Sequence, residues 1–548
     1  MNKDVDFTPW PEEFAMQYRE KGYWQGLPLG DLLRFAAEKF SNNTAVIYGQ
    51  HQLTYRQLDQ KADQLANGLL ALGLKMGDRV VVQLPNIAEF LEVIFALFRI
   101  GVVPVFALPS HRQLEIEFFC QFSNAKAYFI SDTAAGFDYR ELARKVVTTT
   151  KVKHIIVAGE AAEFLSLKKL YTANPSALTL FAPDPASVAL LQLSGGTTSV
   201  PKLIPRTHDD YFYSIRESVD ICEINSESVY LAVLPIAHNF PMSSPGVLGV
   251  LWAGGTIVMA QSGAPDIAFE LIEKHKVTIT AMVPPLAIAW LNSVKNSNKD
   301  LSSLWLMQVG GSKLSAEVAR KIVPAFSCKL QQVFGMAEGL VNYTRLSDPD
   351  EIVINTQGRP ISEADEIRIV DEDDKEVSPG TAGQLITRGP YTIRGYFCAD
   401  EHNAKAFTRD GFYRTGDIVR MTPEGYLIVE GRAKDQINRG GEKIAAEEVE
   451  NQLLAHPAVH DAAVVAMPDP YLEERSCAFI VLNKDIGKTT GASELKNFLR
   501  ERGLAEFKIP DRIELVETFP KTNLGKVSKR SLRNIIAEKL NITNLMPA

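Results

Sequence analysis

Short apolar runs alternate with segments of helical apolar spacing over roughly the first 350 residues. Residues 78–85 (DRVVVQLP) have the length and composition of a buried strand, and residues 87–101 repeat apolar side chains at helical spacing and end at a glycine. The same reading predicts strands at 102–108, 229–236, 255–260, 277–283, 304–310 and 329–335, and helices at 265–275 and 314–326. This alternation is typical of parallel sheets covered by helices, so it predicts an α/β fold with parallel-rich sheets.

After about residue 350 the pattern changes to short apolar runs separated by glycine turns. Four such runs, at 366–371, 383–388, 411–420 and 425–432, predict a small antiparallel β subdomain. Residues 431–444 are rich in glycine and charge, which predicts a linker. Beyond it, we expect a compact α+β unit with helices at 445–456 and 492–503 and strands at 462–467, 477–483 and 512–517. We therefore predict an N-terminal domain, 1–433, and a small C-terminal domain, 434–548.

One long uncharged segment raises the question of a membrane span. Residues 228–265 contain no Asp, Glu, Lys or Arg and are numerous enough to cross a bilayer. Pro235, Pro241 and Pro245 interrupt the segment, however, and polar residues lie in its middle. We therefore predict a buried strand-loop-helix-strand segment and no membrane association.

Length and composition narrow the class of protein. A chain of 548 residues predicts two or more domains, and 46% hydrophobic with 23% charged residues is ordinary for a globular protein. The net charge of -8 provides no basic surface for nucleic acid. The 5 cysteines are scattered without a C-x-x-C pair, so we expect neither a disulfide framework nor a zinc site, and a cytoplasmic location. The N-terminus has no apolar stretch of the kind found in signal peptides.

The segment LQLSGGTTSVPKLIPRTH, residues 191–208, has the composition of a phosphate-binding loop. Glycines let backbone N–H groups approach an anion, hydroxyl side chains add donors, and Lys202 adds a positive charge. The spacing is not that of G-x-x-x-x-G-K-[ST], because Lys202 follows a proline and precedes a leucine. A surface turn explains the same residues, so the loop alone leaves both interpretations open.

Three further segments each follow a predicted parallel strand. They are HNFPMSSPG (238–246), GGSK (310–313) and FGMAEG (334–339). Because ligands of open α/β sheets bind at the carboxyl ends of the strands, we expect these segments to converge on one crevice.

Several charged residues are candidates for chemistry, each with an ordinary alternative. Glu338 lies among apolar and small residues and could hold Mg²⁺ beside phosphate oxygens, or it could begin a helix. Asp417 could accept hydrogen bonds from ribose hydroxyls, or it could be a turn aspartate. Arg432, Lys434 and Lys526 could equally be solvated surface charges.

Taken in order, the motifs resemble those of the adenylate-forming enzymes, which include acyl-CoA synthetases, luciferases and nonribosomal-peptide adenylation domains. LTYRQLDQKADQLANGL resembles the first core motif of that superfamily, LSGGTTSVPKL its phosphate loop and FGMAEG its adenine-and-magnesium motif. YRTGD, GRAKDQINRGGEKI and NLGK resemble its ribose, hinge and catalytic-lysine motifs. The match spans nearly the whole chain and implies that the C-terminal α+β domain is mobile.

The resemblance also implies roles for individual residues. It places Lys526 and His238 among the catalytic residues, Glu338 at Mg²⁺, Lys434 at the hinge, and Gly440 and Gly441 along the path of a thiol. The implied ATP contacts are Ser194, Gly195, Gly196, Thr197, Thr198, Lys202, Gly311, Val333, Gly335, Met336, Ala337, Asp417 and Arg432. The implied substrate contacts are Asn239, Phe240, Ser244, Gly311, Ser312, Ala337 and Val341.

Within the superfamily the chain looks most like the stand-alone aryl-acid ligases of siderophore pathways, especially 2,3-dihydroxybenzoate-AMP ligases. HNFPMSSPG, VGGSKLS and QQVFGMAEGLVN carry this resemblance. Domains that activate amino acids have an aspartate near the position of Asn239, and the neutral side chain here implies an acid without an α-amine. Ser312 stands where many relatives have alanine, which leaves the choice of acid open. Ser244 is expected to meet a ring hydroxyl, with capping of a helix near Pro245 as the alternative.

The implied reaction uses ATP to convert an aryl acid to its adenylate, and then passes the acyl group to the phosphopantetheine thiol of an aryl carrier protein. A salicylate-AMP ligase and an aryl-CoA synthetase that uses free coenzyme A are alternatives. A non-catalytic nucleotide sensor is less consistent with the presence of both Lys526 and Glu338.

Overall fold

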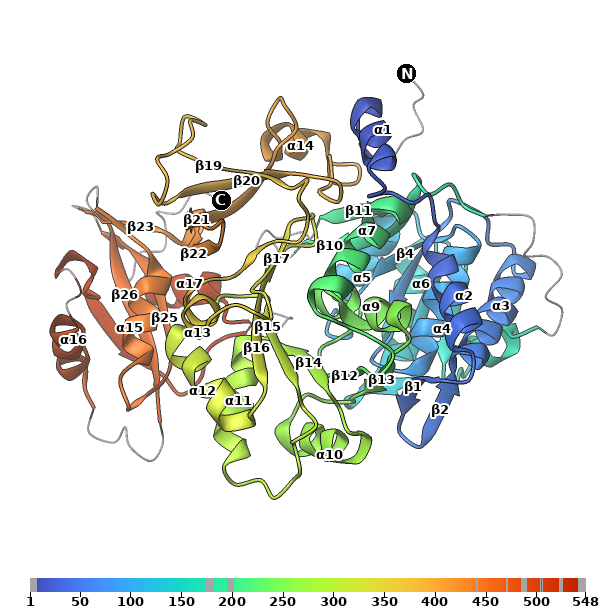
Figure 1. The fold of residues 1–548 in the computed structure, drawn as a ribbon, viewed down its shortest axis with the longest axis horizontal. Helices are drawn as coiled ribbons and strands as arrows, with labels where there is room; N and C mark the ends of the chain where they lie inside the picture. The colour runs from blue at the N-terminus through green and yellow to red at the C-terminus, as the bar shows by residue number, and fades with distance from the viewer. Residues whose placement is uncertain are drawn as a thin grey trace.

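The computed structural model of the chain describes residues 7–172, 182–194, 202–439, 442–469, 472–483, 490–502, 504, 506–521 and 526–540. Two large sheets, each rich in parallel strands, contain most of the strands of the first part of the chain. A smaller antiparallel sheet lies at the top of Figure 1, and the α+β unit formed by the end of the chain lies at its left. The predicted fold class is confirmed.

The first large sheet has seven strands in the order β11-β10-β4-β3-β5-β8-β9. Its strands are β3 (Arg79–Gln83), β4 (Val103–Phe106), β5 (Ala127–Ser131), β8 (His154–Ala158), β9 (Leu165–Ser166), β10 (Val188–Leu193) and β11 (Leu203–Thr207). All neighbours are parallel except β10 and β11, which pair antiparallel on either side of the glycine-rich loop.

The second large sheet has nine strands in the order β18-β17-β16-β15-β14-β12-β13-β1-β2. Its strands are β1 (Thr44–Tyr48), β2 (His51–Thr54), β12 (Val229–Ala232), β13 (Thr256–Met259), β14 (Ile279–Met282), β15 (Leu306–Gly310), β16 (Lys329–Gly335), β17 (Val341–Tyr343) and β18 (Arg359–Pro360). The strands from β16 to β1 are parallel, and antiparallel strands close both ends.

Helices cover both faces of the two sheets. Those that share one hydrophobic cluster with both sheets are α2 (Leu29–Phe40), α3 (Tyr55–Ala71), α4 (Ala88–Arg99), α7 (His208–Ile221) and α9 (Gly246–Ala253). Those on the outer faces are α5 (Gln113–Phe122), α6 (Tyr139–Thr149), α10 (Pro265–His275), α11 (Pro284–Val294) and α12 (Ala316–Phe326). Alternate residues of a strand face opposite ways, so Val80 and Val82 of β3 join the central cluster and Val81 joins the outer one.

The remaining strands form two separate sheets. The antiparallel sheet consists of β19 (Glu366–Val370), β20 (Gly383–Arg388), β21 (Tyr413–Met421) and β22 (Leu427–Arg432). The C-terminal sheet consists of β23 (Ile437–Arg439), β24 (Glu442–Ile444), β25 (Val459–Asp469), β26 (Glu473–Leu482) and β27 (Arg512–Leu515). The helices beside it are α15 (Ala446–Leu454), α16 (Ala492–Glu501) and α17 (Lys529–Lys539).

The prediction that residues 431–444 form a linker is wrong for most of that segment. After a short turn of 3-10 helix at Ala433–Asp435, β23 and β24 pair antiparallel, and β23 also pairs with β26. The apolar residues Ile437 and Ile444 are fully buried in the C-terminal core. Their burial explains why this glycine-rich and charged segment forms a hairpin.

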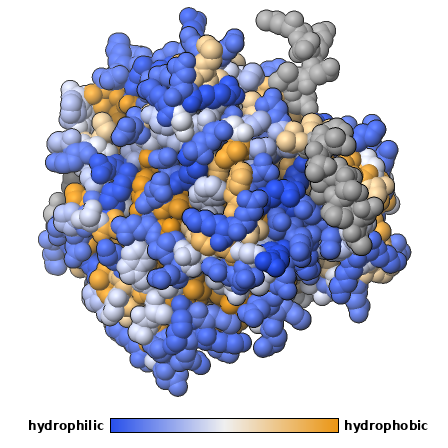
Figure 2. Space-filling view, turned by 45° about the vertical axis from the view of Figure 1, so that its right-hand side comes forward, coloured by the Kyte–Doolittle hydropathy of each residue, from blue (hydrophilic) through white to orange (hydrophobic). Residues whose placement is uncertain are grey.

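The uncharged segment 228–265 forms the predicted buried strand-loop-helix-strand. It contains β12, α8 (Asn239–Ser243), α9 and β13, and most of its residues are buried between the sheets. No helix among the described residues is both long and apolar enough to cross a bilayer. The face seen in Figure 2 is mostly hydrophilic, with hydrophobic residues gathered in patches toward its middle.

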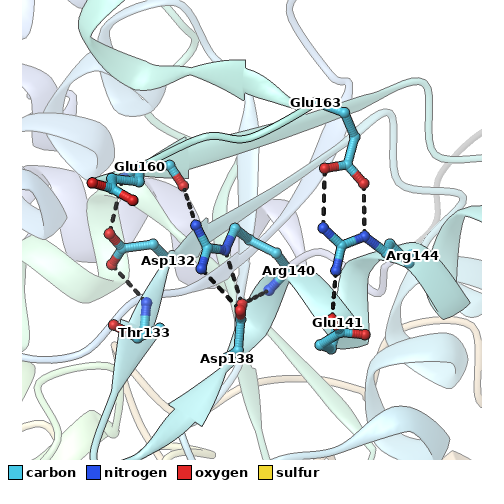
Figure 3. A network of polar contacts seen from close by, with 8 residues as sticks. All are labelled: Asp132, Thr133, Asp138, Arg140, Glu141, Arg144, Glu160 and Glu163. Atoms are coloured by element: carbon cyan, nitrogen blue, oxygen red, sulfur yellow. Dashed lines mark hydrogen bonds and ion pairs between the residues drawn. The ribbon is translucent and has the colours of Figure 1, made fainter.

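A network of ion pairs fastens α6 to the loops that follow β5 and β8 (Figure 3). Arg144 donates to both carboxylate oxygens of Glu163, at 2.7 and 3.0 Å, and Arg140 donates to the carbonyl oxygen of Glu160 at 2.9 Å. Asp132 accepts from the backbone N–H of Glu160 at 2.8 Å. These contacts hold the loops against α6. Because water and salt screen exposed ion pairs, the pairs contribute little to the free energy of unfolding.

Candidate active site

The carboxyl ends of four neighbouring parallel strands, β12, β14, β15 and β16, meet at one edge of the nine-stranded sheet. The closest approach there is at Gly310, the last residue of β15. A Cβ atom on Gly310 would lie 2.7 Å from the carbonyl oxygen of Val333 and 3.1 Å from Cζ of Phe240. Only glycine fits between these groups, so Phe240 of segment 238–246 and Val333, which directly precedes segment 334–339, both pack against Gly310.

His238 forms one side of this crevice, directly before α8. Its Nδ1 accepts a hydrogen bond from the backbone N–H of Phe240 at 3.3 Å. Burial, and to a lesser degree the nearby cation of Lys526, lower the pKa of His238 to about 4. The imidazole is therefore neutral at neutral pH and carries its proton on Nε2, where it is a hydrogen-bond donor.

Asn239 follows and is 8% exposed. Its Oδ1 accepts from the hydroxyl of Tyr211 at 2.9 Å and from the hydroxyl of Ser243 at 3.4 Å. Among the residues that the structure describes, none accepts a hydrogen bond from its Nδ2. The residue thus offers N–H donors and no charge.

Ser244 is 5% exposed, whereas Ser312 is exposed. Burial raises the pKa of Tyr343 well above its usual value, and the hydroxyls of Ser218 and Ser244 oppose this rise, which places Ser244 beside the Tyr343 hydroxyl. No described side chain caps α9, so the helix-capping alternative for Ser244 is not what the structure contains.

Lys526 reaches this crevice from the C-terminal part of the chain. Its Nζ donates to the carbonyl oxygen of Gly311, whose φ of +80° turns the backbone there into the left-handed region that favours glycine. Burial and, to a lesser degree, the nearby Arg432 lower the pKa of Lys526 to about 8, and Asp417 opposes both. Lys526 is therefore not an ordinary solvated lysine but a partly buried amine at the meeting point of the two parts of the chain.

Asp417 and Arg432 lie opposite each other on β21 and β22. The Nε atom of Arg432 lies 2.9 Å from Oδ1 of Asp417, and its Nη1 donates to the carbonyl oxygen of Thr415 at 3.0 Å. Asp417 is 5% exposed, and burial raises its pKa although Arg432 lowers it. Asp417 is thus a strand residue with a fixed partner, and the turn-aspartate alternative does not apply.

Glu338 lies in the turn between β16 and β17, not at the start of a helix. It is 7% exposed, and its Oε1 accepts from the hydroxyl of Tyr396 at 2.8 Å. The hydroxyls of Tyr396 and Tyr413 lie 2.9 Å apart, and Nζ of Lys202 lies 5.8 Å from the Tyr396 ring centroid. Tyr396 is a site residue that was not predicted, because its contact with Glu338 joins residues far apart in the chain.

This arrangement fits a magnesium ion that takes most of its ligands from substrate phosphates and water. Mg²⁺ is typically bound through one or two carboxylates together with phosphates. Among the described residues, no hydrogen bond or ion pair engages the second carboxylate oxygen of Glu338, which could therefore bind such an ion. No cluster of three or more His, Cys, Asp or Glu residues occurs within the described part of the chain, so an all-protein metal cage is not present there.

A buried arginine that the sequence analysis did not single out supports the loop after β16. Arg206 is 1% exposed; its Nη1 donates to the carbonyl oxygen of Ala337 at 2.9 Å and its Nε to Asp210 at 2.6 Å. The backbone N–H of Val341 donates to the hydroxyl of Tyr391 at 3.1 Å. A charged residue within an apolar strand is the signal that could have identified Arg206, because a buried charge requires partners.

Several predicted site residues lie outside the described residues. They are Gly195, Gly196, Thr197 and Thr198 of the glycine-rich loop, and Gly440 and Gly441 of the thiol path. The ends of the loop are described: Ser194 donates its N–H to the carbonyl oxygen of Lys202 at 2.9 Å and its hydroxyl accepts from the N–H of Lys202 at 3.0 Å. Lys434 lies in the short 3-10 turn between the antiparallel and the C-terminal sheets.

The other predicted residues of β16 and of the turn after it lie at the same edge of the sheet. Val333 is buried, Gly335 is exposed at the end of the strand, and Met336 and Ala337 are half-buried. The backbone N–H of Met336 donates to the carbonyl oxygen of Leu340 at 3.2 Å, which closes the turn that carries Glu338.

Comparison with known proteins agrees with this geometry. The sequence matches the model of the AMP-binding enzyme family over residues 33–397 and that of the AMP-binding enzyme C-terminal domain over residues 448–526. It is 62% identical over 535 residues to a 2,3-dihydroxybenzoate-AMP ligase of Bacillus subtilis, covering 97% of this chain and 98% of that protein. It is 53% identical to a vibriobactin-specific 2,3-dihydroxybenzoate-AMP ligase of Vibrio cholerae, covering 96% and 97%.

A solved structure shows the same relationship. The apo structure of MbtA from Mycobacterium smegmatis is 47% identical and matches with a TM-score of 0.75, covering 96% of this chain and 98% of that one.

The low pKa of Lys526 can be measured directly. We expect its reactivity toward a trace of acetic anhydride, followed by peptide mass spectrometry, to rise with an inflection at about pH 8, against about 10.4 for a free lysine side chain. Arg432→Met should move the inflection upward, because it removes a nearby cation and leaves Asp417 unpaired. A wild-type inflection near that of free lysine would contradict the burial described here.

Proposed function

Because this chain belongs to the AMP-binding enzyme family of ATP-dependent adenylate-forming ligases, we propose that it activates 2,3-dihydroxybenzoate with ATP and transfers the acyl group to the phosphopantetheine thiol of an aryl carrier protein. The proposed setting is siderophore biosynthesis. The observation that carries the proposal is the neutral donor group of buried Asn239, which directly follows His238, the residue that lies near the cation of Lys526. The names of two close relatives support the choice of acid.

In the first step, a carboxylate oxygen of the acid attacks the α-phosphorus of ATP. An O–P bond to the acid forms, the bond between the α-phosphorus and the bridging oxygen breaks, and pyrophosphate leaves with that oxygen. The acid supplies the nucleophile, so the protein positions the reactants and stabilises charge. Lys526 would lie between the carboxylate and the α-phosphate, and it is charged at neutral pH because its pKa is about 8.

Other residues would hold the nucleotide. Asp417, kept in place by Arg432, would accept hydrogen bonds from the ribose hydroxyls. Glu338, oriented by Tyr396, would hold Mg²⁺, which when bound neutralises phosphate charge and so helps pyrophosphate leave. The glycine-rich loop that begins at Ser194 would contact the phosphates.

The ring of the acid would extend toward α8. Asn239 would donate to the 2-hydroxyl oxygen, and Ser244, farther along the same loop, would meet the 3-hydroxyl. The neutral His238 would line the edge of this pocket and donate from Nε2 without adding charge.

The second step requires a thiol to reach the acyl carbon. Its sulfur forms a bond to that carbon, AMP leaves with the electrons of the cleaved C–O bond, and the thiol proton passes to solvent. We assign residues 1–433 and 434–548 to separate domains that rotate about Lys434 between the two steps. The separate hydrophobic clusters of the C-terminal part support this division.

The function is tested by ATP–pyrophosphate exchange with benzoate, salicylate, 2,3-dihydroxybenzoate and other hydroxybenzoates, followed by acyl loading of carrier protein or coenzyme A. We expect the highest kcat/KM with 2,3-dihydroxybenzoate and loading of the carrier protein. Preference for salicylate would identify a salicylate-AMP ligase, and efficient loading of coenzyme A would identify an aryl-CoA synthetase. Nucleotide binding with no exchange on any acid would overturn the proposal.

Lys526→Ala should nearly abolish pyrophosphate exchange, because losing a cation at the transition state costs roughly 3–4 kcal/mol or more. The control is Lys521→Ala, which removes an exposed lysine from the same segment and should retain activity. Near-normal exchange by the Lys526 variant, with an unchanged melting temperature, would contradict the role given to this residue.

Ser244→Cys should move the preference from 2,3-dihydroxybenzoate toward salicylate by roughly 1–2 kcal/mol, because a thiol is a weaker hydrogen-bonding partner than a hydroxyl. The measurement is the ratio of kcat/KM for the two acids in wild type and variant. Ser312→Cys, at an exposed serine, is the matched control. An unchanged ratio at Ser244 with a changed ratio at Ser312 would transfer this role to Ser312.

Gly441→Leu should slow thioester formation far more than adenylate formation, because a side chain would narrow the proposed thiol path. Single-turnover measurements separate the two steps. Equal losses in both would count against domain rotation about Lys434.

A further inference from the structure

We propose that Tyr211 is a specificity-determining positioning residue, whose hydroxyl fixes the orientation of the Asn239 amide and thereby makes the pocket favour ortho-hydroxy over ortho-amino benzoates. The proposal rests on the function proposed above and deepens it. It concerns a residue behind the pocket wall that acts on the substrate through Asn239.

The position of Tyr211 is fixed by its surroundings. The residue lies on α7, is fully buried, and its hydroxyl donates to Oδ1 of Asn239 at 2.9 Å. The guanidinium of Arg206 lies over its ring, 4.8 Å from the centroid. Arg206 is itself held by Asp210 and the carbonyl oxygen of Ala337, so the ring cannot shift without disturbing the loop after β16.

The neighbours of the hydroxyl determine which way its proton points. Gln192, which is 2% exposed, and Ser243 both place hydrogen-bonding groups beside it. Burial raises the pKa of Tyr211 to about 12, although the nearby cation of Arg206 and, to a lesser degree, Ser243 and Gln192 oppose the rise, so the hydroxyl keeps its proton at neutral pH. A protonated phenol has one proton to donate, and Oδ1 of Asn239, at 2.9 Å, is its acceptor.

This arrangement fixes which end of the amide faces the substrate. Oδ1 of Asn239 is occupied by Tyr211 and lies within reach of the Ser243 hydroxyl at 3.4 Å. A flipped amide would turn its NH₂ group toward those two hydroxyls and lose both acceptor contacts. Asn239 therefore presents N–H donors, and not a carbonyl oxygen, to the pocket.

A donor at this position distinguishes two kinds of ortho substituent. The hydroxyl of a 2-hydroxybenzoate donates a hydrogen bond to the adjacent carboxylate. The lone pairs of its oxygen are then free to accept from Asn239. The nitrogen of a 2-aminobenzoate shares its lone pair with the ring and offers mainly N–H donors, so it would face Asn239 donor to donor. Leaving such groups unpaired in a buried pocket costs about 1–3 kcal/mol, or roughly tenfold or more in specificity.

The test is Tyr211→Phe, which keeps the ring and removes the hydroxyl. The matched control is Tyr213→Phe, on the same helix, which removes a buried hydroxyl that pairs with Ser362 at 2.7 Å. The measurement is kcat/KM in pyrophosphate exchange for salicylate, 2-aminobenzoate and benzoate. Benzoate has no ortho substituent and reports any general damage to the site.

In Tyr211→Phe the amide of Asn239 is free to turn, so we expect the salicylate to 2-aminobenzoate ratio to fall by about tenfold or more. In Tyr213→Phe we expect it to stay within about twofold of wild type, because losing a hydrogen bond remote from the pocket affects all three acids alike. An unchanged ratio in Tyr211→Phe, or an equal change in both variants, would overturn the inference and leave the proposed function standing. A wild-type protein that activates no ortho-hydroxybenzoate would overturn both.

Discussion

The site depends on one contact between distant parts of the chain, the hydrogen bond from the Lys526 amine to the carbonyl oxygen of Gly311. Burying an ammonium is unfavourable, and this is why the pKa of Lys526 falls to about 8. The amine stays charged at neutral pH because the carbonyl accepts from it and Asp417 lies nearby. Arg432 opposes the charge, but its own pairing with Asp417 limits that effect.

The sheet edge can receive this lysine because β15 ends at Gly310 and a second glycine, Gly311, follows it. Because Gly310 has no Cβ atom, β16 and the ring of Phe240 can both lie close to its backbone. Gly311 then adopts a φ of +80° and presents its carbonyl to Lys526. A side chain at Gly310 would push the walls of the crevice apart, and one at Gly311 would strain the backbone there. The position of the cation thus follows from local backbone geometry.

Features set by local sequence were predictable, and those set by distant partners were not. Seven strands of the large sheets, β3, β4 and β12 to β16, and the burial of residues 228–265 follow from apolar runs and their breakers, and the structure agrees. The hairpin of β23 and β24 was missed because its two buried isoleucines, Ile437 and Ile444, are separated by glycine and charge, and only the C-terminal core reveals their role. Motif order indicated Lys526 and Gly311. Arg206 and Tyr211 were missed because their partners, Ala337 and Asn239, lie 131 and 28 residues away.

The proposed site separates two kinds of recognition, and this separation has a physical reason. The residues proposed for the phosphates and ribose, Glu338, Asp417 and Lys526, carry charge, whereas those proposed for the ring, Asn239 and Ser244, are buried and neutral. A charge in the neutral end would have to be desolvated without a partner, at a cost of several kcal/mol, whereas a neutral amide or hydroxyl there costs far less. An acid with a second charge on its ring would meet the same penalty on entering. The pocket would therefore reject charged side groups through desolvation and sort neutral ones through the direction of its hydrogen bonds.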